Sequence, residues 1–162
     1  MEELTSDATP VSRALAALGV PHRVLRHSGP LRSLEQAAEE RGQRPEQVIR
    51  SIVFRTGPEA FVMVLTSGST KISWPALRSH LGQSRLTTAT EEELLHVTGY
   101  TRGAVAPFGL PAPMRVLVDR GMLVEDEVSL GSGVQGTTIV MRRADLLAAL
   151  GDAETGDFVE GG

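Results

Sequence analysis

The chain has 162 residues, of which 41% are hydrophobic and 22% are charged. This length suits one ordinary domain that buries about two-thirds of its unfolded-chain surface, and the composition is typical of a globular protein rather than a disordered or membrane-inserted one. With 16 basic and 20 acidic side chains, the formal net charge is −4. No global cationic field therefore indicates a nucleic-acid partner, and any RNA contact must be local.

Residue types that the chain lacks exclude several kinds of site. The absence of cysteine excludes disulfides, thiolate nucleophiles and Cys-ligated zinc. Four histidines (His22, His27, His80 and His96) show neither HExxH nor HxH spacing, so we expect no metal site and no cofactor. The acidic N-terminus lacks the apolar core of a signal peptide, and no window approaches 18 uninterrupted apolar residues. We therefore expect a cytoplasmic protein that binds neither membrane nor DNA.

The N-terminal part predicts a tail, two helices and one strand. Residues 1–9 form the predicted tail, and Thr9 and Pro10 then cap and begin a short amphipathic helix that ends at Gly19. A strand is expected over 22–26. The S-x-x-Q pattern that starts at Ser33 has the form of a capping box and predicts a helix through residue 41.

The strongest structural signal is a β-hairpin. Two β-rich runs, 49–56 and 60–66, are separated by Gly57-Pro58-Glu59, and both are long enough to be central strands. A small-residue loop follows over 67–70. After a short extended piece, a helix is predicted with Pro75 near its first turn. Trp74, the only tryptophan of the chain, is adequately explained by packing in the core.

The region after residue 90 changes character at Gly99. Thr90 and Glu93 form a second capping box, which predicts a helix that Gly99 terminates. Residues 99–113 then contain three glycines and three prolines. They are too irregular for a helix or central strand and too apolar for a simple solvent loop, which predicts a shaped, packed loop.

The C-terminal part predicts three strands and one helix. The strands are expected at 114–118, 127–130 and 137–141, and the helix at 143–150. Residues 152–162 resemble a flexible tail. Because helices and strands do not alternate strictly, we predict an α+β fold: a single domain over 10–151 with a mixed, mostly antiparallel sheet and flanking helices.

Three glycine-rich segments are the candidate functional feature, at 67–70, 99–107 and 131–136. Glycine lets a backbone approach a ligand closely and point amide N–H groups at an anion or a carbonyl oxygen. Turn chemistry alone also selects these residues, so the segments could be ordinary turns. The chain has no Walker lysine and no GxSxG elbow, and the residues alone leave the choice open.

The middle segment resembles a known family. Residues 99–109, GYTRGAVAPFG, are similar to the signature loop of the YbaK/ProX family, aminoacyl-tRNA deacylases related to the editing insertion domain of bacterial prolyl-tRNA synthetase; Gly103 to Pro107 match its GxxxP element. The strand at 48–54 resembles the family's strand with a functional lysine, and Gly131-Ser-Gly133 resembles its late glycine loop. The resemblance covers about residues 10–150.

The resemblance implies a trans-editing enzyme that hydrolyses the ester of a mischarged tRNA, with prolyl-tRNA synthetase as a possible partner and tRNA for proline as the leading carrier. The catalytic residues it implies are Arg50, Gly103, Pro107, Gly131, Ser132 and Gly133. The substrate-binding residues it implies are His27, Ser33, Ser67, Tyr100, Ala104, Val105 and Ala106. Alanine, serine, threonine and cysteine esters all remain candidate substrates.

Arg50 departs from the family pattern, which has lysine in this position. Arginine keeps the positive charge but essentially never titrates, so it can position or stabilise charge and cannot donate a proton. The same pocket could therefore serve a non-catalytic module that binds a tRNA 3′ end, a nucleotide or an amino acid. A hydrolase of small esters or amides is a third reading. His27 and Ser33 also have structural readings, as a packed strand residue and a helix cap.

Overall fold

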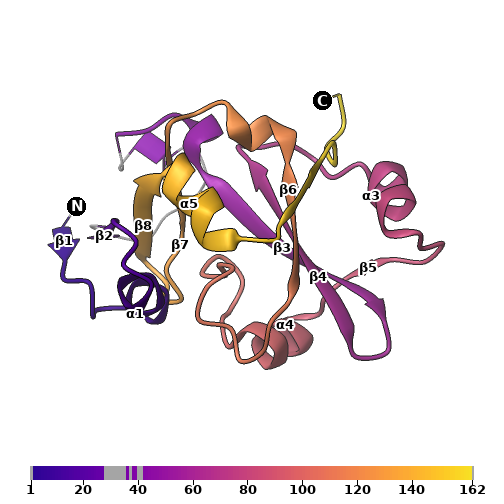
Figure 1. Cartoon of the computed structure of the whole chain (residues 1–162), viewed down its shortest axis with the longest axis horizontal. Helices are drawn as coiled ribbons and strands as arrows, with labels where there is room; N and C mark the ends of the chain where they lie inside the picture. The colour runs from indigo at the N-terminus through magenta and orange to yellow at the C-terminus, as the bar shows by residue number, and fades with distance from the viewer. Residues whose placement is uncertain (1, 28–35, 37, 40–41, 162) are drawn as a thin grey trace.

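The computed structural model describes residues 2–27, 36, 38–39 and 42–161 of the chain. It confirms the α+β class: two sheets and flanking helices form one domain (Figure 1). One sheet was expected, and two are present. The difference arises because the C-terminal hairpin pairs with the N-terminal strands rather than with the central hairpin.

The first sheet is antiparallel throughout and has the order β1-β2-β8-β7. Its strands are β1 (Glu2–Leu4), β2 (Arg23–Arg26), β8 (Thr137–Arg142) and β7 (Glu127–Gly131). Because β1 pairs along its whole length with β2, the predicted N-terminal tail contains a strand. Its three residues were too few to show a period in the sequence.

The second sheet has the order β5-β3-β4-β6-β9 and contains the predicted central hairpin. Its strands are β5 (Thr87–Thr88), β3 (Ile49–Gly57), β4 (Ala60–Ser67), β6 (Arg115–Asp119) and β9 (Glu154–Gly156). β3 pairs antiparallel with β4 and β5, while β4, β6 and β9 are parallel neighbours.

The C-terminal segment corrects the prediction of a flexible tail. β9 pairs with β6, and Phe158 is 1% exposed in a cluster with Leu77 and Leu117. The backbone N–H of Phe158 donates to Asp119 Oδ1 at 2.8 Å. One aromatic side chain and one buried carboxylate thus hold the segment, and neither leaves a periodic signal in sequence.

Helices cover the sheets, and α1 and α4 begin at the caps that the sequence predicted (Figure 1). They are α1 (Pro10–Ala17), α3 (Trp74–Leu81), α4 (Glu91–Thr98) and α5 (Arg143–Leu150), with 3₁₀ turns η1 (Pro45–Gln47) and η2 (Arg120–Leu123). Thr9 Oγ1 accepts the N–H of Ser12 at 3.1 Å, and Thr90 and Glu93 form the predicted capping box. Ser33, the cap predicted for the helix through residue 41, lies outside the described residues.

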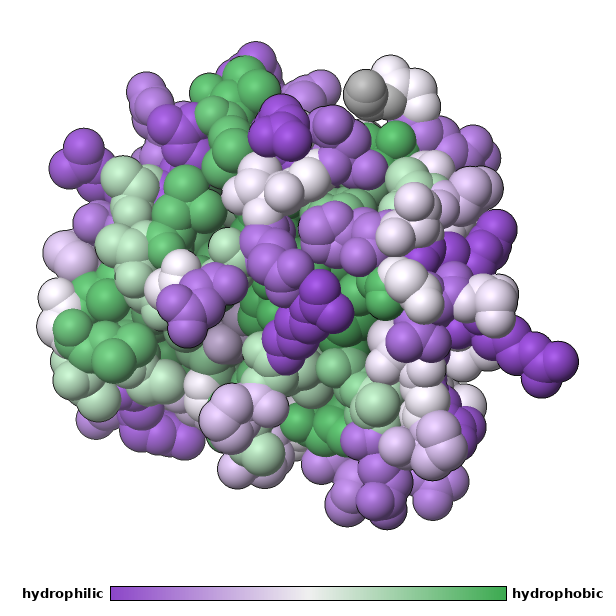
Figure 2. All heavy atoms as spheres, turned by 45° about the vertical axis from the view of Figure 1, so that its right-hand side comes forward, coloured by the Kyte–Doolittle hydropathy of each residue, from purple (hydrophilic) through white to green (hydrophobic). Residues whose placement is uncertain are grey.

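Two hydrophobic clusters lie on opposite faces of the β3–β4 hairpin. Ile49, Val53 and Val105 belong to the larger cluster, while Phe54 packs in the smaller one with its ring edge against Trp74, 5.2 Å between centroids. The surface in Figure 2 is mixed, with hydrophobic areas separated by hydrophilic residues. In the described part of the chain, no helix is long and apolar enough to cross a membrane.

Candidate functional site

The candidate site lies where the two sheets meet, between β3 and β7. A parallel bridge joins Val48 to Ser129 and sets these strands side by side. Two residues further along each strand come Arg50 and Gly131, and side chains two positions apart point to the same face. The fold therefore brings Arg50 to the level of the late glycine loop, 81 positions later in the chain.

The late glycine loop is in close backbone contact with the signature loop. A Cβ added to Gly131 would lie 2.3 Å from the carbonyl oxygen of Val105 and 2.7 Å from the carbonyl carbon of Ala104, so only glycine fits there. The N–H of Gly133 donates to Ala104 O at 2.9 Å. We call these two segments, 99–109 and 131–136, the interlocked loops. The structure thus unites the two segments that the sequence singled out separately.

The hydroxyl of Ser132 shapes its own loop. Its side chain is fully buried, and its Oγ accepts the N–H of Val134 at 3.1 Å and bonds the Thr137 hydroxyl. The Thr137 hydroxyl lies 2.8 Å from the carbonyl oxygen of Val134. Because these local partners occupy Ser132 Oγ, the residue holds the loop in shape rather than presenting a nucleophile.

Tyr100 holds the signature loop from within. Its side chain is 4% exposed, and its hydroxyl donates to Phe108 O at 2.7 Å, with Gly109 O at 3.2 Å. Burial raises the pKa of the Tyr100 phenol above its ordinary value. A buried hydroxyl bonded to backbone carbonyls fixes the loop's curvature, so its observed contacts are structural.

Some backbone N–H groups of the signature loop are not used by the hydrogen bonds that shape it. The N–H of Ala104 donates to Thr101 O at 3.0 Å. Within the described residues, the N–H groups of Val105 and Ala106 take no part in these loop bonds, and both residues are buried. Neighbouring N–H groups of this kind suit a developing oxyanion.

Arg50 is half-buried and is held by the loop after β4. Its Nη1 donates to Thr70 O at 2.9 Å, and Thr70 in turn donates its hydroxyl to Ser67 O at 2.8 Å. Ser67, expected to bind substrate, is buried at the end of β4. Thr66, opposite Arg50 in the hairpin, has a buried hydroxyl without a hydrogen-bond partner in the described chain.

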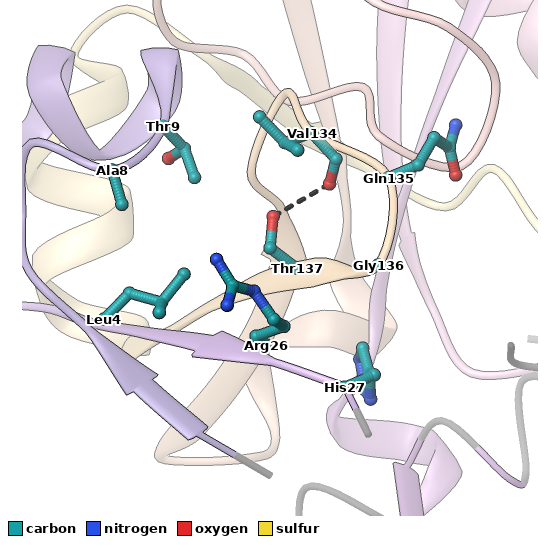
Figure 3. Close-up of a pocket in the computed structure, with 9 residues that line it drawn as sticks. All are labelled: Leu4, Ala8, Thr9, Arg26, His27, Val134, Gln135, Gly136 and Thr137. Carbon is teal, nitrogen blue, oxygen red and sulfur yellow. Dashed lines mark hydrogen bonds between the residues drawn. The ribbon is translucent and has the colours of Figure 1, made fainter. Parts of the chain in front are cut away.

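A cavity of about 460 Å³ lies on the other side of the late glycine loop (Figure 3). Its lining residues come from the end of β1 and the segment before α1, from the end of β2, and from the loop that leads into β8: Leu4, Ala8, Thr9, Arg26, His27, Val134, Gln135, Gly136 and Thr137. His27 is buried and its backbone N–H donates to Gly136 O at 2.8 Å. In Figure 3 its side chain points away from Thr9, whereas Arg26 points toward the space between Leu4 and Thr9.

The sequence analysis did not single out Arg26 or the side chain of Gln135, although Gln135 lies in the glycine-rich segment 131–136. Gln135 Nε2 donates to Thr101 Oγ1 at 2.9 Å and to Arg102 O at 2.7 Å, and thereby joins the cavity wall to the signature loop. No local pattern marks either residue, because a strand-end arginine and a loop glutamine are common on surfaces. In the described part of the chain, no group of three His, Cys, Asp or Glu residues could hold a metal ion.

Comparison with known proteins decides the family. The family described as an aminoacyl-tRNA editing domain matches residues 28–149. This chain belongs to that family. The matched span contains Arg50 and both interlocked loops, as the resemblance of the signature loop implied, and it begins just after His27.

Relatives of this editing domain fall into two groups. A multifunctional Ser/Thr-tRNA deacylase ProXp-y of Escherichia coli K12 is 25% identical over 91% of this chain and 92% of its own length. The proline–tRNA ligase of Kosmotoga olearia is 33% identical over 55% of this chain, which corresponds to 15% of the ligase. The chain therefore spans only a small part of the ligases it matches.

A solved structure shares the whole fold. A crystal structure described as a candidate trans-editing enzyme for prolyl tRNA synthetase superposes with a TM-score of 0.87 and 28% sequence identity, and covers 98% of this chain and 99% of that one. The two chains thus correspond over nearly their full lengths.

Proposed function

We propose that this editing domain hydrolyses, in trans, the ester that joins a small amino acid to the 3′-terminal adenosine of a tRNA, with tRNA for proline as the leading carrier. Family membership and the full-length correspondence to a tRNA deacylase support the reaction. The observation that carries the site is the contact of the interlocked loops, where Gly131 leaves no room for a side chain beside Ala104 and Val105.

The reaction needs an oriented water, a stabilised oxyanion and a pocket that rejects larger side chains. We assign the oxyanion to the N–H groups of Val105 and Ala106. Arg50, level with Gly131 on the neighbouring strand, supplies a permanent positive charge that attracts the tRNA 3′ end. The remaining predicted residues, Gly103, Pro107 and Gly133, set the backbone path, and Ser67 and Thr70 position Arg50.

The general base is assigned to the substrate rather than to the protein. Two histidines are engaged elsewhere: His22 contacts Ser12 at 2.6 Å, and His80 contacts Glu154 at 3.3 Å. Ser132 is occupied by its own loop. The ribose hydroxyl or the α-amino group of the substrate can assist the attacking water, as the family resemblance implies. This assignment predicts that substrates without either group are hydrolysed slowly.

The test is deacylation of tRNA for proline charged with alanine, serine, threonine, cysteine or proline. The wild-type protein is expected to hydrolyse at least one of the four noncognate esters above its spontaneous rate and to spare the proline ester. Arg50→Ala is expected to reduce turnover by about 10- to 100-fold, because one charge contact is lost. Arg50→Lys, which restores the family residue, is the matched control and should retain or raise turnover.

A non-catalytic binding module remains the second candidate, and Arg50 is the observation that favours it. Its guanidinium is bonded to Thr70 O and cannot donate a proton. A wild-type protein that leaves every ester intact, together with an active Arg50→Lys variant, would support the binding module. Hydrolysis of small esters but of no charged tRNA would instead support the third reading, a small-ester hydrolase. Association with prolyl-tRNA synthetase is a further proposal, testable by co-sedimentation.

A further inference from the structure

The cavity beside Arg26 lies largely outside the family match. Of its nine lining residues, the five from the N-terminal side precede residue 28, where the match begins: Leu4, Ala8, Thr9, Arg26 and His27. Its volume of about 460 Å³ lies within the range of small-molecule sites, roughly 300–1,000 Å³. The cavity is therefore large enough for one nucleotide, and more than half of its lining comes from a part of the chain that the family match does not cover.

The lining combines the two kinds of group that a nucleotide requires. Leu4, Ala8 and Val134 offer apolar surface to a base or ribose. Arg26 offers a guanidinium, whose planar fork matches phosphate oxygens. Figure 3 shows this side chain directed into the space between the segment that carries Leu4, Ala8 and Thr9 and the loop before β8.

The ion pair of Arg26 does not block a phosphate. Arg26 Nη1 lies 2.9 Å from Glu2 Oε1, and the two side chains are 59% and 62% exposed. Exposed pairs of this kind contribute little to stability, so a phosphate can replace the carboxylate. The guanidinium is therefore available to an anionic ligand that enters the cavity.

The cavity is physically connected to the proposed reaction centre. Its wall residue Gln135 is bonded to Thr101 and Arg102, directly before the GxxxP element of the signature loop. Arg102 is itself exposed and forms no ion pair within the described part of the chain. Two cations thus flank the tip of the β7–β8 hairpin, one on the cavity side and one on the side of the signature loop.

We propose that this cavity binds a nucleotide that precedes the ester-bearing adenosine of the tRNA 3′ end, with Arg26 on its phosphate and Leu4 and Val134 against its base or ribose. The RNA strand then crosses the hairpin tip past Arg102, and its terminal ester reaches the interlocked loops. This inference rests on the proposed function. It explains how a chain of net charge −4 holds an RNA end, through local cations rather than a global field.

Arg23 provides a matched control on the same strand. Both arginines lie on β2 and pair with β1 glutamates, and Arg23 Nε lies 3.1 Å from Glu3 Oε1 with side-chain exposures of 56% and 62%. Three positions apart, the two side chains lie on opposite faces of the strand, and Arg23 does not line the cavity. Arg23→Gln and Arg26→Gln therefore remove the same charge and the same kind of ion pair.

The test measures binding of an uncharged, fluorescein-labelled acceptor-stem minihelix ending in CCA, by anisotropy over a salt series. Arg26→Gln is expected to weaken binding about five- to tenfold, as for one exposed charge-assisted contact, and to reduce the salt slope by about 1. Arg23→Gln should bind within about twofold of wild type. Both variants should keep the wild-type unfolding temperature, since both pairs are exposed.

A second measurement separates this inference from the proposed function. With an aminoacyl ester of free adenosine, which carries no phosphate, Arg26→Gln should hydrolyse as fast as wild type, while its kcat/KM for the charged tRNA falls. Wild-type binding without any hydrolysis would contradict the proposed function and leave the cavity assignment standing. Equal binding by Arg26→Gln and wild type, or no minihelix binding by wild type, would overturn the cavity assignment.

Discussion

The interlocked loops and the cavity rim lie on two sides of one hairpin tip, and they are built in opposite ways. The loops meet backbone to backbone, with Gly131 against the carbonyls of Ala104 and Val105 and with Tyr100 buried beneath. The cavity rim instead carries Arg26, whose exposed side chain forms an exposed ion pair with Glu2. Under the two proposals, the reaction depends on backbone shape, whereas capture of the RNA depends on charge.

The strongest test of this contrast is Gly131→Ala. The new Cβ would meet Val105 O at 2.3 Å, which forces the two loops apart. We expect a loss of about 1–3 kcal/mol in unfolding free energy. We also expect about 100-fold slower deacylation, the effect of a misplacement of about 1 Å in a catalytic site. Chemical denaturation and single-turnover deacylation measure the two effects.

Gly136→Ala is the control for that substitution. Gly136 lies in the same hairpin tip and has φ +79°, but an added Cβ would meet nothing within 4 Å. Its cost is therefore conformational and about 1 kcal/mol. Because Gly136 also lines the cavity, the rates are compared at saturating tRNA, where deacylation should be slowed far less than in Gly131→Ala. Equal losses of activity in the two variants would show that the Gly131 contact has no special part in the reaction.

Tyr100→Phe should have an intermediate effect. It removes the hydroxyl that bonds Phe108 O and leaves that carbonyl without its partner, at an expected cost of about 1–2 kcal/mol. Turnover should fall less than in Gly131→Ala because the backbone contact between the loops persists. Thermal unfolding followed by circular dichroism, together with the deacylation rate, gives both values.

The same residue predicts a pH dependence at the alkaline end. Burial raises the pKa of Tyr100 in the folded protein above its ordinary value of 10.0. The neutral phenol therefore stabilises the fold below about pH 10, and this contribution is lost as pH rises toward the folded-state pKa. Wild type should lose more stability than Tyr100→Phe above pH 10. Parallel pH profiles of the two proteins would contradict the assignment.

The smallest expected effect lies far from the loops, at Glu154. Arg115 donates hydrogen bonds to its carboxylate, with a smaller contribution from His80, and together they lower the pKa of Glu154 from 4.5 to about 2. Stability from this group is present above pH 4.5 and is lost as pH falls toward 2. Because the pair is exposed, Glu154→Gln should cost less than about 1 kcal/mol at pH 7.

That cost should shrink as the wild type is acidified, which denaturation at pH 7 and pH 3 measures. Deacylation at pH 7 should be unchanged in Glu154→Gln, since the residue lies on β9, which pairs with β6 and not with the interlocked loops. A large loss of activity would indicate that the C-terminal strand is coupled to the site.

Local features of the fold were predictable from the sequence, and long-range pairings were not. The caps at Thr9 and Thr90 and the turn after β3 depend on residues within a few positions of each other, and the structure confirms them. The pairing of β9 with β6 joins residues 37 positions apart and rests on burial of Phe158, which no local period reveals.

In the candidate site, too, local features were predictable and long-range contacts were not. The glycine-rich segments were recognisable because glycine marks a close backbone approach, but their mutual contact joins Gly131 to Val105 across 26 positions. Ser132 was predicted to be catalytic and Tyr100 to bind substrate, and both roles stay predictions; in the structure their hydroxyls bond nearby backbone groups. Arg26 was not named from the sequence because its proposed role arises from a cavity that three separate segments create.

The most direct test of the account is single-turnover deacylation of tRNA for proline charged with a small noncognate amino acid, by wild type, Gly131→Ala and Gly136→Ala. The account predicts hydrolysis by wild type above the spontaneous rate, about 100-fold slower hydrolysis by Gly131→Ala, and a much smaller loss in Gly136→Ala. A wild type no faster than the spontaneous reaction on every ester, or a Gly131→Ala variant as fast as wild type, would contradict the claim that the interlocked loops form the deacylation site.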